Sequence, residues 1–339
     1  MQKSFHLKSR IFTAVTMLLI VASAGRLLAW GAWGHKHINR AAVFALPEGM
    51  RRFYYNHIDF ITEGAVVPDL RRSLLDDKNE PGRHYIDLEN FHTPVSELPR
   101  TPAEAYRKYD TQFLNENGNL PWYIQTLSDK LTRAFRRRDK SEILFLSAEL
   151  AHYVGDAHMP LHTATNYNGQ LTGQKGVHAL WESEIPELFG SRYDFRTDTA
   201  HFIPDLTACT WQIITASHDL EDTLLADEMS VRREFEGKEM YRKDAAGNVV
   251  RSYNQPVYSE VYAHAFDSSM HGMVARQLRR SIQDVADYWY TAWVNAGRPD
   301  LLSLDDPHLT LQNRKNYRKE YKAWSKGRLL NLSRDKEPG

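Results

Sequence analysis

Cysteine, excess charge of one sign and a long apolar run are all scarce or absent in this sequence of 339 residues. Its single cysteine, Cys209, excludes a disulfide scaffold, a Cys-rich zinc finger and an iron–sulfur protein. Cys209 lies in an apolar stretch, which predicts a buried, inert thiol. Lys+Arg and Asp+Glu each number 43, which excludes a strongly basic nucleic-acid coat protein and an acidic disordered chain. A chain of this length can bury enough surface to fold without disulfides.

The N-terminal apolar run is 14 residues, from Ile11 to Ala24, and it follows three basic residues. A membrane-spanning helix needs about 20 apolar residues, so the pattern is typical of a secretory signal peptide. We predict a signal peptide over residues 1–29, cleaved after the small residue Ala29, and export to the periplasm or the extracellular space. An uncleaved anchor is the alternative. Cleavage would leave 310 residues with 39 basic and 43 acidic side chains.

The mature chain reads mostly as helix, because its apolar residues recur at helical spacing. Residues 63–100 are rich in Pro, Gly and Asp, which predicts a loop region with a short helix at most, and 244–248 resembles a hairpin tip. We therefore predict an all-α domain over 30–300, followed by a basic C-terminal tail over 301–339. A solvated tail is the simpler interpretation, and weak attraction to an anionic surface is the alternative.

Histidines and carboxylates follow a metal-ligand pattern in the middle of the chain. His152 and Asp156 stand four residues apart on one predicted helix, and His178 and Glu182 repeat this spacing. Side chains four residues apart share a helix face and can reach one metal ion. His162 follows the first pair closely. Imidazole and carboxylate together suit Zn²⁺, so these five residues predict a zinc site.

With His35, Asp69 and His84 further upstream, the order of these residues resembles the zinc-dependent phospholipase C and S1/P1 nuclease superfamily. The motifs are His84-Tyr-Ile-Asp, His-x3-Asp-x5-His and His-x3-Glu, and the resemblance covers roughly residues 30–297. It implies a phospholipase C/P1 nuclease-like helical fold around a trinuclear zinc cluster. In that superfamily the mature chain begins with a Trp whose free amino group binds zinc, which is the position of Trp30 after cleavage.

The resemblance also implies the ligands of each zinc. They are Asp69, His84, His152 and Asp156 for one zinc; His162, His178 and Glu182 for a second; and the amino and carbonyl groups of Trp30, His35 and the other oxygen of Asp156 for the third. His37 is the alternative to His35. The implied reaction is in-line attack of hydroxide on phosphorus, which hydrolyses a phosphoric ester.

Four residues are candidates for contact with substrate or for support of the reaction. Asp69 counts as catalytic as well as a ligand, and Arg72, three residues later, is expected to support the phosphate, although the spacing does not decide between Arg71 and Arg72. Asp87 is expected to orient a ligand or contact substrate. Tyr85 is expected to bind substrate or, alternatively, to pack. His158 fits neither ligand spacing and is expected to have a supporting or structural role.

The branch of the superfamily determines the expected substrate. Glu182 and the short connection from His162 to His178 favour the phospholipase C branch, whereas the position of His35 and the Asp69-x2-Arg72 spacing resemble the nuclease branch. We predict a phospholipase C-type phosphodiesterase that acts on a phospholipid head group, with transient membrane-surface contact and no protein partner. A single-strand nuclease or 3′-nucleotidase is the alternative, and a non-catalytic zinc-binding secreted protein is a third possibility.

Overall fold

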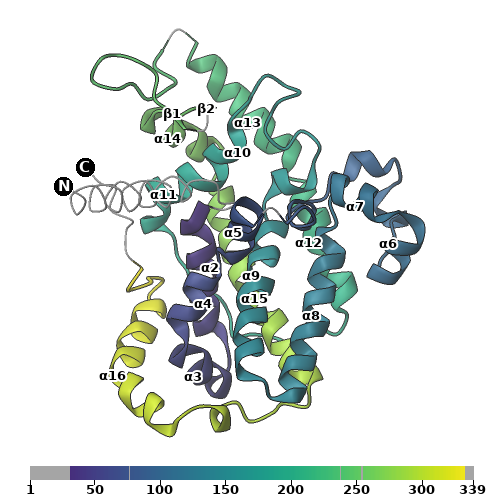
Figure 1. Cartoon of the computed structure of the whole chain (residues 1–339). Helices are drawn as coiled ribbons and strands as arrows, with labels where there is room; N and C mark the ends of the chain where they lie inside the picture. The colour runs from purple at the N-terminus through teal and green to yellow at the C-terminus, as the bar shows by residue number, and fades with distance from the viewer. Residues whose placement is uncertain (1–30, 76, 237, 253–254, 333–339) are drawn as a thin grey trace, which may run out of the picture.

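The computed structural model describes residues 31–75, 77–236, 238–252 and 255–332. The predicted signal peptide and Trp30 lie outside the described residues. Four helices, α2 (Gly31–Ala45), α8 (Leu120–Arg137), α9 (Lys140–Ala157) and α15 (Met273–Asn295), pack on one another through the middle of the molecule, and α4 (Ile58–Gly64) packs on α2 and α9 (Figure 1). The prediction of an all-α fold is confirmed.

Helix α9 lies in the centre of this packing and carries part of the predicted metal site. Nearly every side chain from Ile143 to Ala157 is buried, as expected for a helix that is covered on all sides. Its first turn is capped by Asp139, whose carboxylate accepts a hydrogen bond from the amide of Glu142 at 3.1 Å. It ends shortly before Pro160, which cannot continue a helix.

The other elements surround this core. The α-helices are α3 (Glu48–Asn56), α5 (Val67–Leu74), α6 (Pro102–Lys108), α7 (Thr111–Asn117), α10 (Val177–Ala179), α11 (Ile185–Phe189), α12 (Leu206–His218), α13 (Glu221–Glu234), α14 (Glu260–Ser269) and α16 (Pro307–Trp324). The 3₁₀ turns are η1 (Pro81–Arg83), η2 (Leu88–Phe91), η3 (Val95–Glu97), η4 (Pro160–Thr163), η6 (Gly190–Arg192) and η7 (Leu302–Leu304), and η5 (Leu180–Glu184) is a π-helical turn.

Regular β-structure in the described part of the chain is limited to one small hairpin region. Strands β1 (Arg251–Ser252) and β2 (Gln255–Pro256) pair antiparallel. The predicted hairpin tip at 244–248 is present, since the carboxylate of Asp244 accepts hydrogen bonds from the amides of Ala246 and Asn248. Residues 63–100 contain the short helix α5 and three 3₁₀ turns, in agreement with the predicted loop region. None of the helices described here has the length and hydropathy needed to cross a membrane.

The C-terminal segment corrects the prediction of a solvated tail. Helix α16 packs against α3 and α2 at one end of the molecule (Figure 1). Tyr317, Tyr321 and Trp324 form an aromatic stripe at helical spacing, and Trp324 is buried. Glu320 is also buried, 2.6 Å from the guanidinium of Arg40 on α2. The solvated-tail prediction is wrong for residues 307–324, because the basic side chains occupy only the outer face of a packed helix. The boundary near residue 300 stays a prediction.

Candidate metal centre

The structure brings eight of the nine predicted metal ligands into one cluster, and the ninth, Trp30, lies outside the described residues. These residues lie on helices and turns that are far apart in the sequence. Seven of the eight are buried, and His178 is about one-quarter exposed. They are His35 on α2, Asp69 on α5, His84 after η1, His152 and Asp156 on α9, His162 on η4, His178 on α10 and Glu182 on η5.

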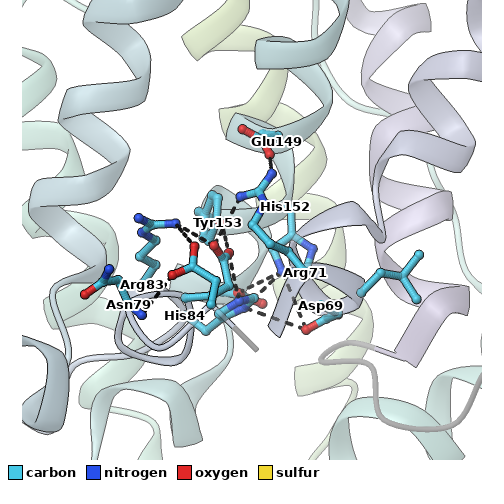
Figure 2. Close-up of polar contacts among 12 residues, drawn as sticks. Asp69, Arg71, Asn79, Arg83, His84, Glu149, His152 and Tyr153 are labelled. Carbon is cyan, nitrogen blue, oxygen red and sulfur yellow. Dashed lines mark hydrogen bonds and ion pairs between the residues drawn. The ribbon is translucent and has the colours of Figure 1, made fainter. Parts of the chain in front are cut away.

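The first group consists of Asp69, His84, His152 and Asp156, three of which are labelled in Figure 2. The Nε2 atom of His152 lies 3.1 Å from Nδ1 of His84 and 3.3 Å from Oδ2 of Asp156. The Oδ1 atom of Asp69 lies 3.8 Å from His84 Nδ1 and 4.0 Å from His152 Nε2. The other ring nitrogen of His152 donates to the carbonyl oxygen of Ala65 at 2.8 Å, which leaves Nε2 as the acceptor facing the group.

The second group consists of His162, His178 and Glu182. The two oxygens of Glu182 lie 3.5 Å from His162 Nε2 and 2.9 Å from His178 Nε2. Nδ1 of His178 donates to the carbonyl oxygen of Tyr167 at 2.9 Å, so Nε2 is left to face the group. A backbone carbonyl therefore orients one histidine in each of these two groups.

Asp156 connects all parts of the cluster. Its Oδ2 faces His84 and His152, whereas its Oδ1 lies 3.4 Å from His35 Nε2 and 3.6 Å from His162 Nδ1. The His35 ring also stacks on the His152 ring, with centroids 3.8 Å apart. A carboxylate whose two oxygens face different ligand groups has the geometry of a bridging ligand.

Buried polar atoms without hydrogen-bond partners show that the cluster fits a metal. Both ring nitrogens of His35, both oxygens of Asp69, and Oδ1 of Asp156 are buried and make no hydrogen bond. Leaving such atoms unsatisfied costs free energy. Zinc bonds of about 2.0–2.2 Å place tetrahedral ligand atoms roughly 3.3–3.6 Å apart, close to most of the separations here. The set of imidazoles and carboxylates is the donor chemistry that zinc prefers.

The electrostatics of the cluster are those of buried acids surrounded by histidines. Burial raises the pKa of Asp69, despite the opposing effect of His152 and His84. Burial acts in the same direction on Asp156, but His152 and His162 outweigh it and hold its pKa well below the usual value. Burial lowers the pKa of His162 to about 4. A cation among these groups would favour the anionic acids and neutral imidazoles that bind metals.

The structure distinguishes Arg71 from Arg72. Arg71 points toward the interior, where its guanidinium lies 3.1 Å from Glu80 and contacts Glu149 (Figure 2). Arg72 is half-buried, and it is close enough to Tyr85 and to His178 of the second ligand group for its charge to act on both side chains.

Tyr85 and Asp87 lie on either side of Ile86, whose amide donates to the carbonyl oxygen of His162 at 2.8 Å. Ile86 is buried, whereas Tyr85 and Asp87 are both partly exposed. The Tyr85 hydroxyl donates to the carbonyl oxygen of Glu116. Burial, together with the charge of Glu89, raises the pKa of Asp87 to about 7.

Two further histidines are placed outside the ligand groups. Nε2 of His158 lies 2.8 Å from an oxygen of Asp284, which gives His158 a partner away from the cluster. His37 stacks on Trp33, and its Nδ1 lies 2.6 Å from the carbonyl oxygen of the same residue. His35, and not His37, therefore points into the cluster.

The sequence interpretation missed the buried residues around His84. Glu80 is fully buried and its Oε1 lies 3.4 Å from His84 Nε2. It stands four residues before His84, the same spacing as the two ligand pairs, and that spacing was the available signal. The structure also brings Glu89, His218 and Glu221 within metal-binding distance of one another, in a more exposed position that the motifs did not indicate.

The helical fold and the buried cluster of imidazoles and carboxylates are together typical of a helical zinc-binding protein. The chain belongs to the zinc dependent phospholipase C family, whose model matches residues 34–225. The predicted family resemblance is thus confirmed for the phospholipase C branch, and the comparisons give no support to the nuclease branch. No curated protein matches the sequence.

The solved structures that are similar to this chain include two clostridial toxins. One is alpha toxin from Clostridium absonum, with 11% identity, a TM-score of 0.45, and coverage of 80% of this chain and 66% of that chain. The other is Clostridium perfringens alpha-toxin from an avian strain, with 13% identity, a TM-score of 0.45, and coverage of 82% and 66%. The chain therefore spans slightly less than two thirds of the length of each toxin chain.

Proposed function

We propose that this chain is an exported phospholipase C-type phosphodiesterase that binds three zinc ions and hydrolyses the phosphoric ester of a phospholipid. The observation that carries the proposal is the position of Asp156, with one oxygen toward His84 and His152 and the other toward His35 and His162. Membership of the zinc dependent phospholipase C family supports the metal and the class of substrate.

In this proposal, one set of residues would bind the metals and another set would contact the substrate. Zinc, when bound, supplies Lewis-acid chemistry that activates water and neutralises phosphate charge. The eight clustered ligands and the amino and carbonyl groups of Trp30 would hold the metals. Asp69 would be a zinc ligand, and because neither of its oxygens makes a hydrogen bond, one of them would also accept a hydrogen bond from the attacking water. Arg72 would hold a phosphate oxygen, while Tyr85 and Asp87 would contact the rest of the substrate.

Export belongs to the same proposal. A free amino group at Trp30 exists only if residues 1–29 are removed, so signal-peptide cleavage would create a zinc ligand. The N-terminal sequence of the exported protein tests this directly. We expect it to begin at Trp30, and any other mature N-terminus would contradict the third ligand group.

The activity is tested by offering the processed, zinc-loaded protein phosphatidylcholine vesicles, single-stranded DNA, RNA and 3′-nucleotides in parallel. We expect release of diacylglycerol from the vesicles and no cleavage of the nucleic acids. Strong nucleic-acid cleavage without diacylglycerol would contradict the proposed substrate. Bound zinc without turnover on any of the four would indicate a non-catalytic protein.

His35 and His37 offer a matched pair of variants for this assay. Both lie on α2, but only His35 faces Asp156, whereas His37 stacks on Trp33. We expect His35→Gln to lose one zinc and most of the activity, and His37→Gln to keep both. Equal behaviour of the two variants would contradict the assignment of the third ligand group.

A further inference from the structure

The two ring nitrogens of His84 face different partners. Nδ1 points into the first ligand group, 3.0 Å from Asp156 Oδ2 and 3.1 Å from His152 Nε2. Nε2 points away from the group toward Glu80, whose Oε1 lies 3.4 Å from it. The contact is an ion pair, since His84 Nε2 makes no hydrogen bond within the described residues, and both residues are buried away from solvent. Glu80 is therefore the acid that lies nearest to the Nε2 proton. Only one of the two nitrogens can carry the proton in a neutral ring, and the other is then free to bind a metal.

Glu80 is itself held in place by a network of one buried and two partly buried side chains. Its Oε2 accepts hydrogen bonds from Arg71 at 3.1 Å and from Arg83 at 2.5 Å, and its Oε1 accepts one from the Tyr153 hydroxyl. The three donors are labelled in Figure 2. Two guanidinium groups lie beside the buried carboxylate and compensate its charge. Glu80 is therefore held as a fixed acceptor next to His84.

The network joins the segments that carry the first ligand group. Arg71 follows Asp69 by two residues on α5, and Tyr153 follows His152 directly on α9. Glu80 lies one turn before His84. A shift of Glu80 would consequently disturb the orientation of the His84 ring, and its fixed position restrains all three segments together.

We propose that Glu80 is a positioning residue for the metal centre, whose carboxylate accepts the Nε2 proton of His84 and so presents Nδ1 to the metal. This inference rests on the proposed function, since it assumes that the first ligand group binds zinc. Carboxylates that orient a metal-bound histidine typically contribute 10–100-fold to metal affinity. The role belongs to Glu80 because no other acid faces His84 Nε2 in the ion pairs of the described residues.

The competing explanation is a purely structural role, in which Glu80 only neutralises the partly buried Arg71 and Arg83. Glu149 supplies the control, because it contacts the same Arg71 from α9 and has no contact with His84 in the described structure. Glu80→Gln and Glu149→Gln each remove one negative charge beside Arg71. Only Glu80→Gln removes the charged acceptor of the His84 ring.

The test is a zinc titration of the processed, metal-free protein in competition with a chelator, for the wild type and both variants. We expect Glu80→Gln to bind one of its zinc ions about 10–100-fold more weakly, whereas Glu149→Gln keeps wild-type affinity. Equal affinities in all three proteins, or equal losses in both variants, would overturn the inference.

A second substitution covers the case in which metal-free Glu80→Gln does not fold. Glu80→Asp keeps the negative charge that Arg71 and Arg83 require, but its shorter side chain withdraws the carboxylate from His84. We expect the same loss of zinc affinity, with circular dichroism unchanged, and wild-type affinity in a folded Glu80→Asp would overturn the inference. Failure of the proposed function is distinguishable, because the wild type itself would then bind no zinc in the titration.

Discussion

The buried ion pair between Arg40 and Glu320 gives a sharp prediction about stability. Arg40 on α2 is 2% exposed and Glu320 on α16 is 4% exposed, and their side chains meet at 2.6 Å. Glu320 also accepts hydrogen bonds from the Tyr55 hydroxyl and from Asn331, both at 2.8 Å. The substitution Glu320→Ala would leave Arg40 with Asp59 as its remaining acid, which lies 3.4 Å away and is 92% exposed.

The expected cost of Glu320→Ala is about 3–5 kcal/mol of unfolding free energy, since removing one partner leaves a buried charge uncompensated. Urea unfolding of the metal-free protein measures it, because bound zinc would add its own binding energy to the folded state. The double variant Arg40→Met, Glu320→Met is expected to recover most of the loss. A loss below about 1 kcal/mol for Glu320→Ala would refute the reasoning, because exposed pairs contribute that little.

Three further predictions concern individual residues. The pKa of Asp87 is raised to about 7, so the folded protein keeps a proton on this carboxyl that the unfolded chain releases near pH 4. The stability that this proton contributes is complete below about pH 4 and is lost as the pH rises through 7. Urea unfolding should show that Asp87→Asn reduces this decline by about 1 kcal/mol, a value discounted because the carboxyl is partly exposed. Burial, with nearby acids, raises the pKa of Cys209 to about 12, so a thiol reagent at pH 8 should label it slowly in the folded protein and quickly in urea. Gly118 has a φ of +87°, and a Cβ there would overlap the carbonyl of Tyr85, so Gly118→Ala should lower the unfolding free energy by about 2 kcal/mol or more.

Each of these three predictions has a contradicting result. Asp87→Asn and the wild type should not show the same pH profile of stability. Rapid labelling of Cys209 in the folded protein would contradict the protected thiol. A Gly118→Ala variant with wild-type stability would show that the backbone beside Tyr85 can move without cost.

The proximity of several candidate ligands was predictable because their spacing in the sequence encodes their geometry. His152 with Asp156, and His178 with Glu182, repeat at four residues, so each pair occupies one helix face whatever the tertiary structure. The all-α fold followed from helical periodicity in the same way. The family resemblance added His35, Asp69 and His84, which come from distant segments that no local pattern connects.

Features that depend on tertiary contacts were harder to predict. The choice between Arg71 and Arg72 depends on contacts of Arg71 with Glu80 and Glu149. Glu149 reaches Arg71 only after α9 has packed against α5, and Glu80 reaches it from the segment before η1. The basic composition of the segment led to the prediction of a solvated tail in place of the packed helix α16, although its aromatic stripe was present in the sequence. Composition describes the outer face of such a helix, whereas the periodicity of its aromatic residues describes the face that packs.

The most direct test of the account is the number of zinc ions per chain in the processed protein, counted by native mass spectrometry. The count should be made with His218→Gln, so that the separate group of Glu89, His218 and Glu221 does not add an ion. We predict three zinc ions in this background. Adding Asp156→Asn should remove at least two, because both oxygens of Asp156 face ligand groups. A single zinc ion before the change, or three after it, would contradict a cluster organised by Asp156.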